Sequence, residues 1–504
     1  MNDTLLRTGD LRRLEGEAMA RLPAGALMAR AADAVADLAA TMARGLPRGR
    51  AIEVLVGGGN NGGDALLAAS RLQARGFAVR CRALSSEAPM AADARAVHAR
   101  WRAQGGIFHD AAGLAESLAA GPALVIDGLF GIGLSRPLAG LAANLVDTVN
   151  RSGAAVLAVD VPSGLDAETG WVVGGAQGTA IRATRTLTFI ADKPGLHTGQ
   201  AASHTGRVEV DGLGVFAGCA VPAPAGAGHL ITRAAARRLP VARRADAHKG
   251  SHGGVLVLGG APGTRGAAWL AALAAQASGA GKVWLACPGD GASDPTYPQL
   301  MTRAFDAPLQ AGETLVIGCG LGASDIALAR LHDALASPAA CVLDADALNL
   351  LAREPALLAR WPGPPATRIL TPHPLETARL LGCDTASVQA DRIASAQRLA
   401  AICGAVVVLK GAGSVLAHPD GRWAINASGS PALATGGTGD VLAGLLGALL
   451  AQGYDAWTAA RLGVWLHGHA GDRWHLAHPQ GAGLNPLHLV DLIPAAWPVA
   501  SETP

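Results

Sequence analysis

Residues 435–440 of this chain, Thr-Gly-Gly-Thr-Gly-Asp, have the composition of an anion-binding turn. Glycine is costly inside a helix, so these glycines predict a turn, and the apolar run that follows predicts a helix beginning near Asp440. Free backbone N–H groups and the positive end of the helix dipole would bind a phosphate or a developing negative charge. Asp440 could be a plain helix cap, but a cap does not account for the glycines and threonines before it. We therefore expect an anion hole with Asp440 as a base at its rim.

A second glycine-rich segment follows a short apolar strand expected at residues 52–56. Residues 57–64, Gly-Gly-Gly-Asn-Asn-Gly-Gly-Asp, precede a helix expected at 65–75 and a strand at 77–84. This β-α-β pattern puts a polar turn where doubly wound sheets bind dinucleotides, although the motif is not G-x-G-x-x-G. A simple tight turn does not need two asparagines and an aspartate, which favours a binding site.

Two further aspartates follow expected strands in the first half. Asp127 ends the apolar run 123–127, and Asp160 follows the run 154–159. One such aspartate would be an ordinary turn former or helix cap. Because the carboxyl ends of strands in an open α/β sheet meet at one edge, we expect these residues and the turn at 57–64 to form one site.

The second half of the chain repeats the alternation of short apolar strands and helices. Strands are expected at 255–258, 282–286, 314–317, 341–343, 368–370 and 406–409. Helical segments separate most of them, so this half is also predicted to be α/β with a largely parallel sheet. Polar or glycine-rich loops follow the strands at 259–266, 318–322, 344–346, 371–374 and 410–414. Each loop alone is weak evidence for a site, and a histidine such as His373 is more often structural.

The length of 504 residues predicts more than one domain. Residues 10–44 are expected to form an alanine-rich helix before the first strand. Residues 217–228 are rich in proline and alanine without periodicity, which predicts a linker. We therefore expect one domain at 1–225 and another at 226–504.

Composition excludes several classes of function. The formal net charge of +2 gives no case for a nucleic-acid or membrane-surface partner. Seven scattered cysteines form no C-x-x-C pair, so neither a disulfide framework nor a zinc site is indicated. The N-terminus lacks an apolar signal region, and the longest apolar run is too short to span a membrane, which favours a cytoplasmic protein. Only four lysines occur, so a retained lysine hints at a need for a compact charge.

These motifs together resemble a known pair of domains. The second half is similar to the ribokinase-like ADP/ATP-dependent NAD(P)H-hydrate dehydratases, through H-K-G-S-H-G-G, G-C-G-L-G, D-A-D-A-L-N, T-P-H, L-K-G-A-G-S and A-T-G-G-T-G-D-V-L. The first half resembles the NAD(P)H-hydrate epimerase domain, through G-G-G-N-N-G-G-D, D-G-L-F-G-I-G, V-D-V-P-S-G-L-D and K-P-G-L-H-T-G. Their order matches the fused bacterial repair enzymes. The resemblance implies a Rossmann-like N-terminal domain followed by a ribokinase-like α/β C-terminal domain.

The resemblance implies a repair reaction on hydrated NADH and NADPH. The first domain would interconvert the R and S hydrates, and the second would dehydrate the S form with ADP and Mg²⁺, giving AMP and phosphate. Asp440 would remove the proton from the substrate hydroxyl, which attacks the terminal phosphate. The hydrate would contact Ala267, Gly322, His373 and Asp440. The nucleotide would contact Lys410, Gly411, Ala412, Gly413, Ser414 and Gly439.

In the first domain the resemblance implies a substrate site and a potassium site. Asp160 is the candidate acid or base for epimerisation and also a substrate contact. The other substrate contacts would be Asn60, Asn61, Gly62, Gly63, Asp64, Gly131, Ile132, Gly133, Leu134, Ser135, Arg136 and Pro137. The K⁺ ligands would be Asn61, Asp127 and Ser163, and hard oxygen ligands suit such a cation.

Two departures and two rival hypotheses accompany this resemblance. Leu375 stands where the family usually has glycine, and Ser430-Pro431-Ala432 replaces the usual N-P-G, which allows a small shift in the packing of the substrate loop. A ribokinase-like small-molecule kinase shares the G-x-G-D turn but lacks an N-N-G-G-D domain. Alternatively, the first half is a dinucleotide-binding regulatory module. The sequence leaves the choice between ADP and ATP open, although a fused bacterial architecture favours ADP, and it allows a homo-oligomer.

Overall fold

The computed structural model describes residues 3–44, 47, 50–84, 91–121, 123–216, 224–239, 245–289, 297–360 and 367–498. The chain divides into two compact units, Met1–Ala227 and Gly228–Pro504. Most of the linker expected at 217–228 lies outside the described residues. Among the described helices, none combines the length and apolar character needed to cross a membrane.

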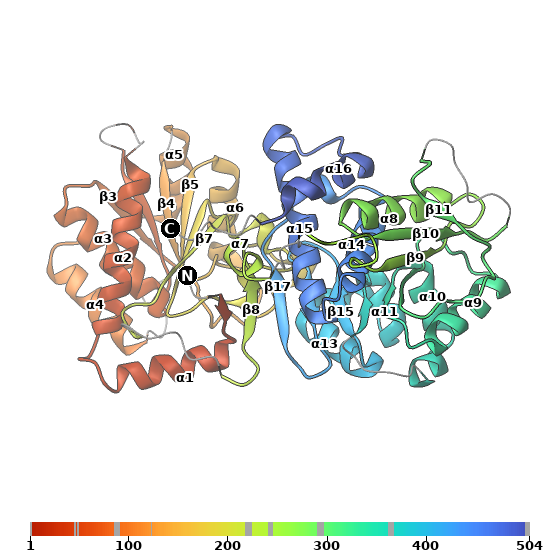
Figure 1. Ribbon diagram of the computed structural model, residues 1–504. Coiled ribbons are helices and arrows are strands. Elements are labelled where there is room, and N and C mark those ends of the chain that lie inside the picture. The colour runs from red at the N-terminus through yellow and green to blue at the C-terminus, as the bar shows by residue number, and fades with distance from the viewer. Residues whose placement is uncertain are drawn as a thin grey trace. The chain divides into compact units, whose positions relative to one another are not determined.

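The first unit is built on a parallel sheet with the strand order β3-β2-β4-β5-β6-β7 (Figure 1). Its strands are β2 (Ile52–Val56), β3 (Val79–Ala83), β4 (Leu124–Gly128), β5 (Ala155–Val159), β6 (Arg185–Phe189) and β7 (Arg207–Asp211), with the short β1 (Thr4–Leu5) outside this sheet. All of the expected strands are present.

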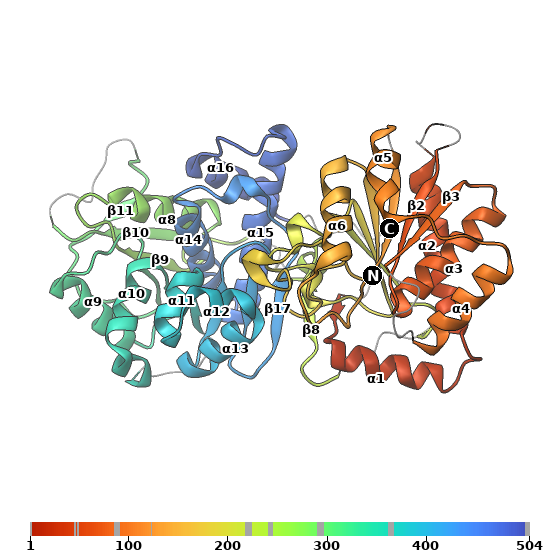
Figure 2. The ribbon, with the colours of Figure 1, turned by 180° about the vertical axis from the view of Figure 1, so that it is seen from behind.

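Alternating side chains of these strands fill two apolar cores. Ile52, Val54 and Val56 of β2 pack with α2 (Ala26–Ala43) and α3 (Asn60–Ala74). Leu55 points to the other face and packs with α5 (Leu114–Ala119) and α6 (Gly140–Ser152). This alternation follows from the two-residue period of a strand. Helices therefore cover both faces of the sheet, with α4 (Ala92–Ala103) beside α3 (Figure 2).

Two expectations for this unit were wrong in their boundaries. The helix expected at 10–44 is two helices, α1 (Thr8–Met19) and α2, because the chain turns at Pro23 and at Gly25, whose φ is 74°. The turn expected to extend to residue 64 already becomes helix α3 at Asn60. Position 62 in this helix requires glycine, because the backbone of Gly57 approaches it closely. A Cβ on residue 62 would lie 1.9 Å from the carbonyl oxygen of Gly57.

The second unit has a larger sheet with the order β8-β17-β16-β15-β14-β13-β12-β9-β10-β11. The strands are β8 (Gly228–Ile231), β9 (Gly254–Leu258), β10 (Lys282–Ala286), β11 (Met301–Thr302), β12 (Glu313–Ile317), β13 (Cys341–Leu343), β14 (Arg368–Leu370), β15 (Val406–Leu409), β16 (Val415–Ala417) and β17 (Trp423–Asn426). Pairing is parallel except that β16 runs antiparallel to β15 and β17. All six expected strands are present, and β8, β11, β16 and β17 were not expected.

Helices also cover both faces of this second sheet (Figures 1 and 2). One face carries α8 (Arg265–Ala277), α14 (Thr438–Ala451), α15 (Ala456–Ala477) and α16 (Pro486–Ala496), which form one apolar core with Val255, Val316 and Val406. The remaining helices are α7 (Arg233–Ala236), α9 (Asp325–Ala336), α10 (Ala345–Arg353), α11 (Pro374–Leu381), α12 (Thr385–Ala390) and α13 (Arg392–Cys403). Helix α14 is buried along nearly its whole length, so its first turn has a fixed position at the sheet edge.

Candidate active sites

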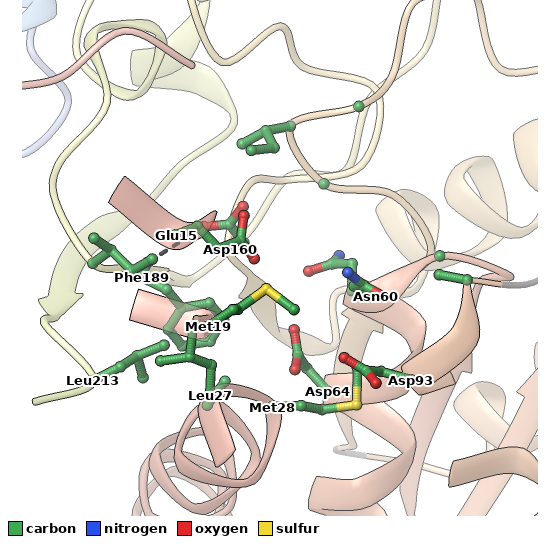
Figure 3. Close-up of a pocket in the computed structure, with 18 of the residues that line it drawn as sticks. Glu15, Met19, Leu27, Met28, Asn60, Asp64, Asp93, Asp160, Phe189 and Leu213 are labelled. Atoms are coloured by element: carbon green, nitrogen blue, oxygen red, sulfur yellow. Dashed lines mark hydrogen bonds between the residues drawn. The ribbon is translucent and has the colours of Figure 1, made fainter. Parts of the chain in front are cut away.

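A pocket of about 700 Å³ opens at the carboxyl edge of the first sheet (Figure 3). Its walls come from α1, the 22–31 segment, the start of α3, the loop after β4 and Asp160 after β5. The volume is within the range of small-molecule and cofactor sites. Of the predicted substrate contacts, those that line this pocket are Asn60, Asn61, Asp64, Gly131, Ile132, Gly133, Leu134 and Asp160. Gly62, Gly63, Ser135, Arg136 and Pro137 are not among its lining residues.

Asp160 is held in place by a buried lysine. Its φ of 65° is rare for a residue other than glycine, and its Oδ1 accepts a hydrogen bond from Lys193 Nζ at 2.8 Å. The hydroxyl of Thr188 donates to the same oxygen at 3.2 Å, and Lys193 is only 2% exposed. Lys193 stood in one of the sequence motifs, but nothing in the motif predicted this ion pair.

Three more carboxyl groups face the pocket with Asp160: Glu15 on α1, Asp64 on α3 and Asp93 on α4 (Figure 3). Burial, followed by the negative charge of Asp160, raises the pKa of Asp64 well above its usual value, and Glu15 and Asp93 add to the effect. Burial and Asp160 likewise raise the pKa of Glu15. Sequence reasoning missed Glu15 and Asp93, because both lie on ordinary amphipathic helices outside any motif.

The predicted potassium ligands lie close together around the carbonyl oxygen of Phe130, which accepts from both Asn61 and Ser163. Asp127 Oδ1 accepts from the hydroxyl of Ser163 at 2.6 Å, and Asp127 Oδ2 accepts from the Ser163 backbone N–H at 2.8 Å. Asn61 donates through Nδ2 to the carbonyl oxygen of Phe130 at 2.9 Å, while its own Oδ1 is buried and has no hydrogen-bond partner among the described residues. Burial raises the pKa of Asp127 to about 6. An unpartnered buried oxygen beside other oxygen donors has the chemistry of a site for a hard cation.

In the second unit, Asp440 lies in the first turn of α14 but does not cap it. The N-cap residue is Gly437, with a φ of 95° and no side-chain capping bond. The hydroxyl of Thr438 braces the turn by donating to the carbonyl oxygens of Leu433 and Thr435, each at 2.9 Å. This geometry excludes the plain-cap interpretation of Asp440. Burial, followed by Asp344, raises the pKa of the Asp440 carboxyl to about 6.

Lys410 and Asp344 form an ion pair beside the same turn. Lys410 Nζ lies 2.5 Å from Asp344 Oδ1. A Cβ placed on Gly439 would lie 3.5 Å from Lys410 Nζ and 3.8 Å from Asp344 Oδ2, so this pair is next to the start of α14. Burial alone would lower the pKa of Lys410, but Asp344 and Glu376 outweigh it and the pKa is raised. The site therefore contains a permanent cation.

The other predicted hydrate contacts lie on three separate segments of the second unit. His373 caps α11 through Nδ1, and its Nε2 lies 3.2 Å from Glu376 Oε1. Burial raises the pKa of Glu376 to about 7. The backbone N–H of Gly322 donates to Asp346 Oδ2 at 2.8 Å. Ala267 lies in the first turn of α8.

The predicted nucleotide loop at 410–414 is shaped by an arginine that the sequence did not reveal. Arg392 is 2% exposed and donates to the carbonyl oxygens of Leu409 and Lys410 at 3.2 and 3.1 Å. Its guanidinium would lie 2.9 Å from a Cβ on Gly411. Ser414 closes the loop by donating to the carbonyl oxygen of Gly411 at 3.0 Å.

Comparisons with known proteins cover both halves of the chain. A family model described as NAD(P)H-hydrate dehydratase matches residues 255–495, and one described as YjeF-related protein N-terminus matches residues 24–195. The bifunctional NAD(P)H-hydrate repair enzyme Nnr of Escherichia coli is 37% identical over 484 residues, which are 93% of this chain and 89% of the relative. The chain belongs to the family of bifunctional NAD(P)H-hydrate repair enzymes.

Further known proteins match the whole chain or its second half. The enzyme of Gloeobacter violaceus is 40% identical, with 93% of each chain covered. A solved structure described as the ADP/ATP-dependent NAD(P)H-hydrate dehydratase from Bacillus subtilis, co-crystallised with ATP and Mg²⁺, is 32% identical, covers 53% of this chain and 97% of its own, and has a TM-score of 0.47.

Membership of the repair family confirms the resemblance predicted from the motifs and the α/β fold class of both halves. It also confirms the prediction of a bifunctional enzyme over a small-molecule kinase with a regulatory module.

Proposed function

We propose that the first unit interconverts the R and S hydrates of NADH and NADPH, and that the second dehydrates the S hydrate at the expense of ADP, giving AMP and phosphate. The observation that supports the proposal is that each of the two units has its own group of predicted site residues. One unit provides the pocket with Asp64 and Asp160, and the other joins Asp440 to the Lys410–Asp344 pair.

In the dehydratase site, Asp440 takes the proton from the C6 hydroxyl of the hydrate, and the hydroxyl oxygen attacks the terminal phosphoryl group of ADP. A carboxyl pKa of about 6 suits a general base that works near neutral pH. The open turn at 436–439 offers backbone N–H groups to the charge that develops on the phosphoryl oxygens. Phosphate then leaves from C6 with its bonding electrons, and loss of a C5 proton restores the dihydronicotinamide ring.

The substrates are placed by residues on the surrounding loops. Residues 410–414 and Gly439 hold the nucleotide, and Ala267, Gly322 and His373 hold the hydrate beside Asp440. Mg²⁺ would accompany ADP and neutralise its phosphate charge. Such an ion takes one or two carboxylates besides phosphate oxygens, and Asp344, whose carboxyl group lies beside the start of α14, fits that need.

In the epimerase site, Asn61, Asp127 and Ser163 would hold K⁺. The buried, unpartnered Oδ1 of Asn61 supports this assignment, since a cation would satisfy it. The ion would supply a fixed positive charge beside Asn61 and tie the start of α3 to the end of β4 and the loop after β5.

The test is direct turnover of the purified protein with NADH hydrate and ADP. We expect the absorbance of the reduced nicotinamide ring to return, and AMP and phosphate to appear in equal amounts. Omitting ADP should stop the reaction. Accumulation of a phosphorylated product without recovery of NADH would instead identify a small-molecule kinase and refute the proposal.

A further inference from the structure

The acidic groups around the first pocket differ in how they are held. Asp160 is paired with Lys193 at 2.8 Å and also accepts from the backbone N–H of Phe189 at 3.3 Å. Asp64 has no hydrogen-bond partner for its carboxyl group in the described part of the chain. The carboxylate of Asp160 is thus fixed and neutralised by a cation, whereas the carboxyl group of Asp64 is not held by a hydrogen bond.

The two carboxyl groups also reach the pocket from different walls. Figure 3 shows Asp64 near the start of α3 and Asp160 on the loop after β5, with the thioether of Met19 in view between them. A flat ring that lies between these two walls would meet one carboxyl group on each of its faces. Inversion at a ring carbon needs such an arrangement, because the old and new substituents lie on opposite faces.

We propose that Asp64 is the catalytic proton donor for the R-to-S conversion and that Asp160, positioned by Lys193, is the proton acceptor on the opposite face. This inference rests on the proposed epimerase function and adds a second catalytic residue to it.

The step balances without an oxidant or reductant. The N1 lone pair forms an N1=C6 double bond as the C6–O bond breaks, and the departing hydroxyl takes a proton from Asp64 and leaves as water. A water molecule then bonds through its oxygen to the other face of C6 and gives its proton to Asp160, while the N1=C6 π electrons return to N1. Proton exchange with solvent then restores protonated Asp64 and ionised Asp160 for the next turnover. The reverse conversion uses the same two groups with their roles exchanged.

The charges around the pocket suit this route. Loss of the hydroxyl leaves a cation on N1 and C6, and the carboxyl groups of Glu15, Asp93 and Asp160 outnumber the cations Lys193 and Arg12 among the lining residues. Preorganised negative charge stabilises such a cation. The raised pKa of Asp64 has the same origin, since burial and these carboxylates favour its protonated form.

The experiment follows conversion of purified R hydrate to S hydrate by the full chain without ADP, so that the dehydratase site is idle. Asp64→Asn should lower kcat by about 10²–10⁴-fold with a smaller change in KM, and Asp64→Glu should recover part of the loss. Dehydration of S hydrate by the same variants, with ADP present, should stay at the wild-type rate, which controls for the state of the second unit.

The pH dependence of the R-to-S rate distinguishes a catalytic role of Asp64 from a purely structural one. Asp64 must be protonated to act, so the R-to-S rate should fall as pH rises through its pKa. Glu15→Gln removes a negative charge that raises this pKa, so it should move the alkaline limb to lower pH. A limb that does not move would overturn the assignment of Asp64 as the donor.

Oxygen exchange tests the chemical step itself. In ¹⁸O-labelled water, each inversion should place one solvent oxygen on C6, and S hydrate that retains its original oxygen would overturn the step. A fully active Asp64→Asn variant would overturn the role of Asp64 while leaving the epimerase function intact. A wild-type chain that does not interconvert the hydrates would overturn the proposed function and this inference with it.

Discussion

The lysines show how single residues mark the two sites. Of the four lysines in the chain, Lys193 and Lys410 each form an ion pair with an aspartate that follows a strand, at 2.8 and 2.5 Å. A compact ammonium fits such a pair where the broad guanidinium of arginine does not. Because the chain otherwise uses arginine, the scarcity of lysine indicated both sites. It did not identify the aspartates that pair with the lysines.

At the residue scale, Asp440→Asn should lower the rate of dehydration by about 10²–10⁴-fold, because the amide cannot accept the proton. Nucleotide binding, measured by calorimetry with ADP, should remain. The matched control is Asp333→Asn on α9, where the aspartate is 62% exposed, and it should keep wild-type turnover. Near-normal turnover of the Asp440 variant would remove Asp440 from the mechanism.

The raised pKa of Asp440 also sets two pH dependences. The base acts when ionised, so dehydration by the wild type should rise as pH increases through about 6. The folded state penalises the ionised carboxyl relative to the unfolded chain, so above this pH Asp440→Asn should raise the free energy of unfolding. Denaturant titrations at pH 5 and pH 8 (roughly one to two units either side of that pKa) measure the difference.

At the scale of elements, three segments that are distant in sequence share the expected potassium site: the start of α3, the end of β4 and the loop after β5. Replacing K⁺ by tetramethylammonium should slow epimerisation and lower the melting temperature of the first unit. Asn61→Leu should abolish this K⁺ dependence, because it removes the orphaned Oδ1. A melting temperature that is the same in both salts would reject the site.

The contact between α14 and α8 fixes the position of Asp440. A Cβ on Gly444 would lie 1.9 Å from the carbonyl oxygen of Ala271, so Gly444→Ala should push the helices apart and destabilise the second unit by about 1–3 kcal/mol. Gly266→Ala in α8 meets no atom within 4 Å and should be neutral or stabilising by up to about 1 kcal/mol. Chemical denaturation of both variants makes the comparison, and equal stabilities would contradict the packing argument.

The elements also show how far the sequence could predict the fold and the sites. Strand ends were predictable, because apolar runs followed by glycine and aspartate have a strong local signal. Asp440 and the ligand set of Asn61, Asp127 and Ser163 came from such motifs and from family resemblance. Glu15 and Arg392 could not be predicted, since their roles depend on where helices α1 and α13 pack, and no local pattern encodes that packing.

At the scale of the whole molecule, the chain divides at residues 227 and 228, close to the boundary expected at 225 and 226. Each unit has its own sheet, apolar core and candidate site. The product of the first reaction is the substrate of the second, and it is a free small molecule. The S hydrate that is released by the first unit of one copy should therefore be a substrate for the second unit of another copy.

The most direct test of this account is complementation between two full-length variants on a mixture of R and S hydrates with ADP. Asp160→Asn alone should consume the S hydrate at the normal rate and then slow to spontaneous epimerisation, and Asp440→Asn alone should recover almost no NADH. Mixed together, the two variants should convert both hydrates to completion, because each supplies the site that the other lacks. A mixture that stops after the S fraction, with both variants folded, would contradict the assignment of one activity to each unit.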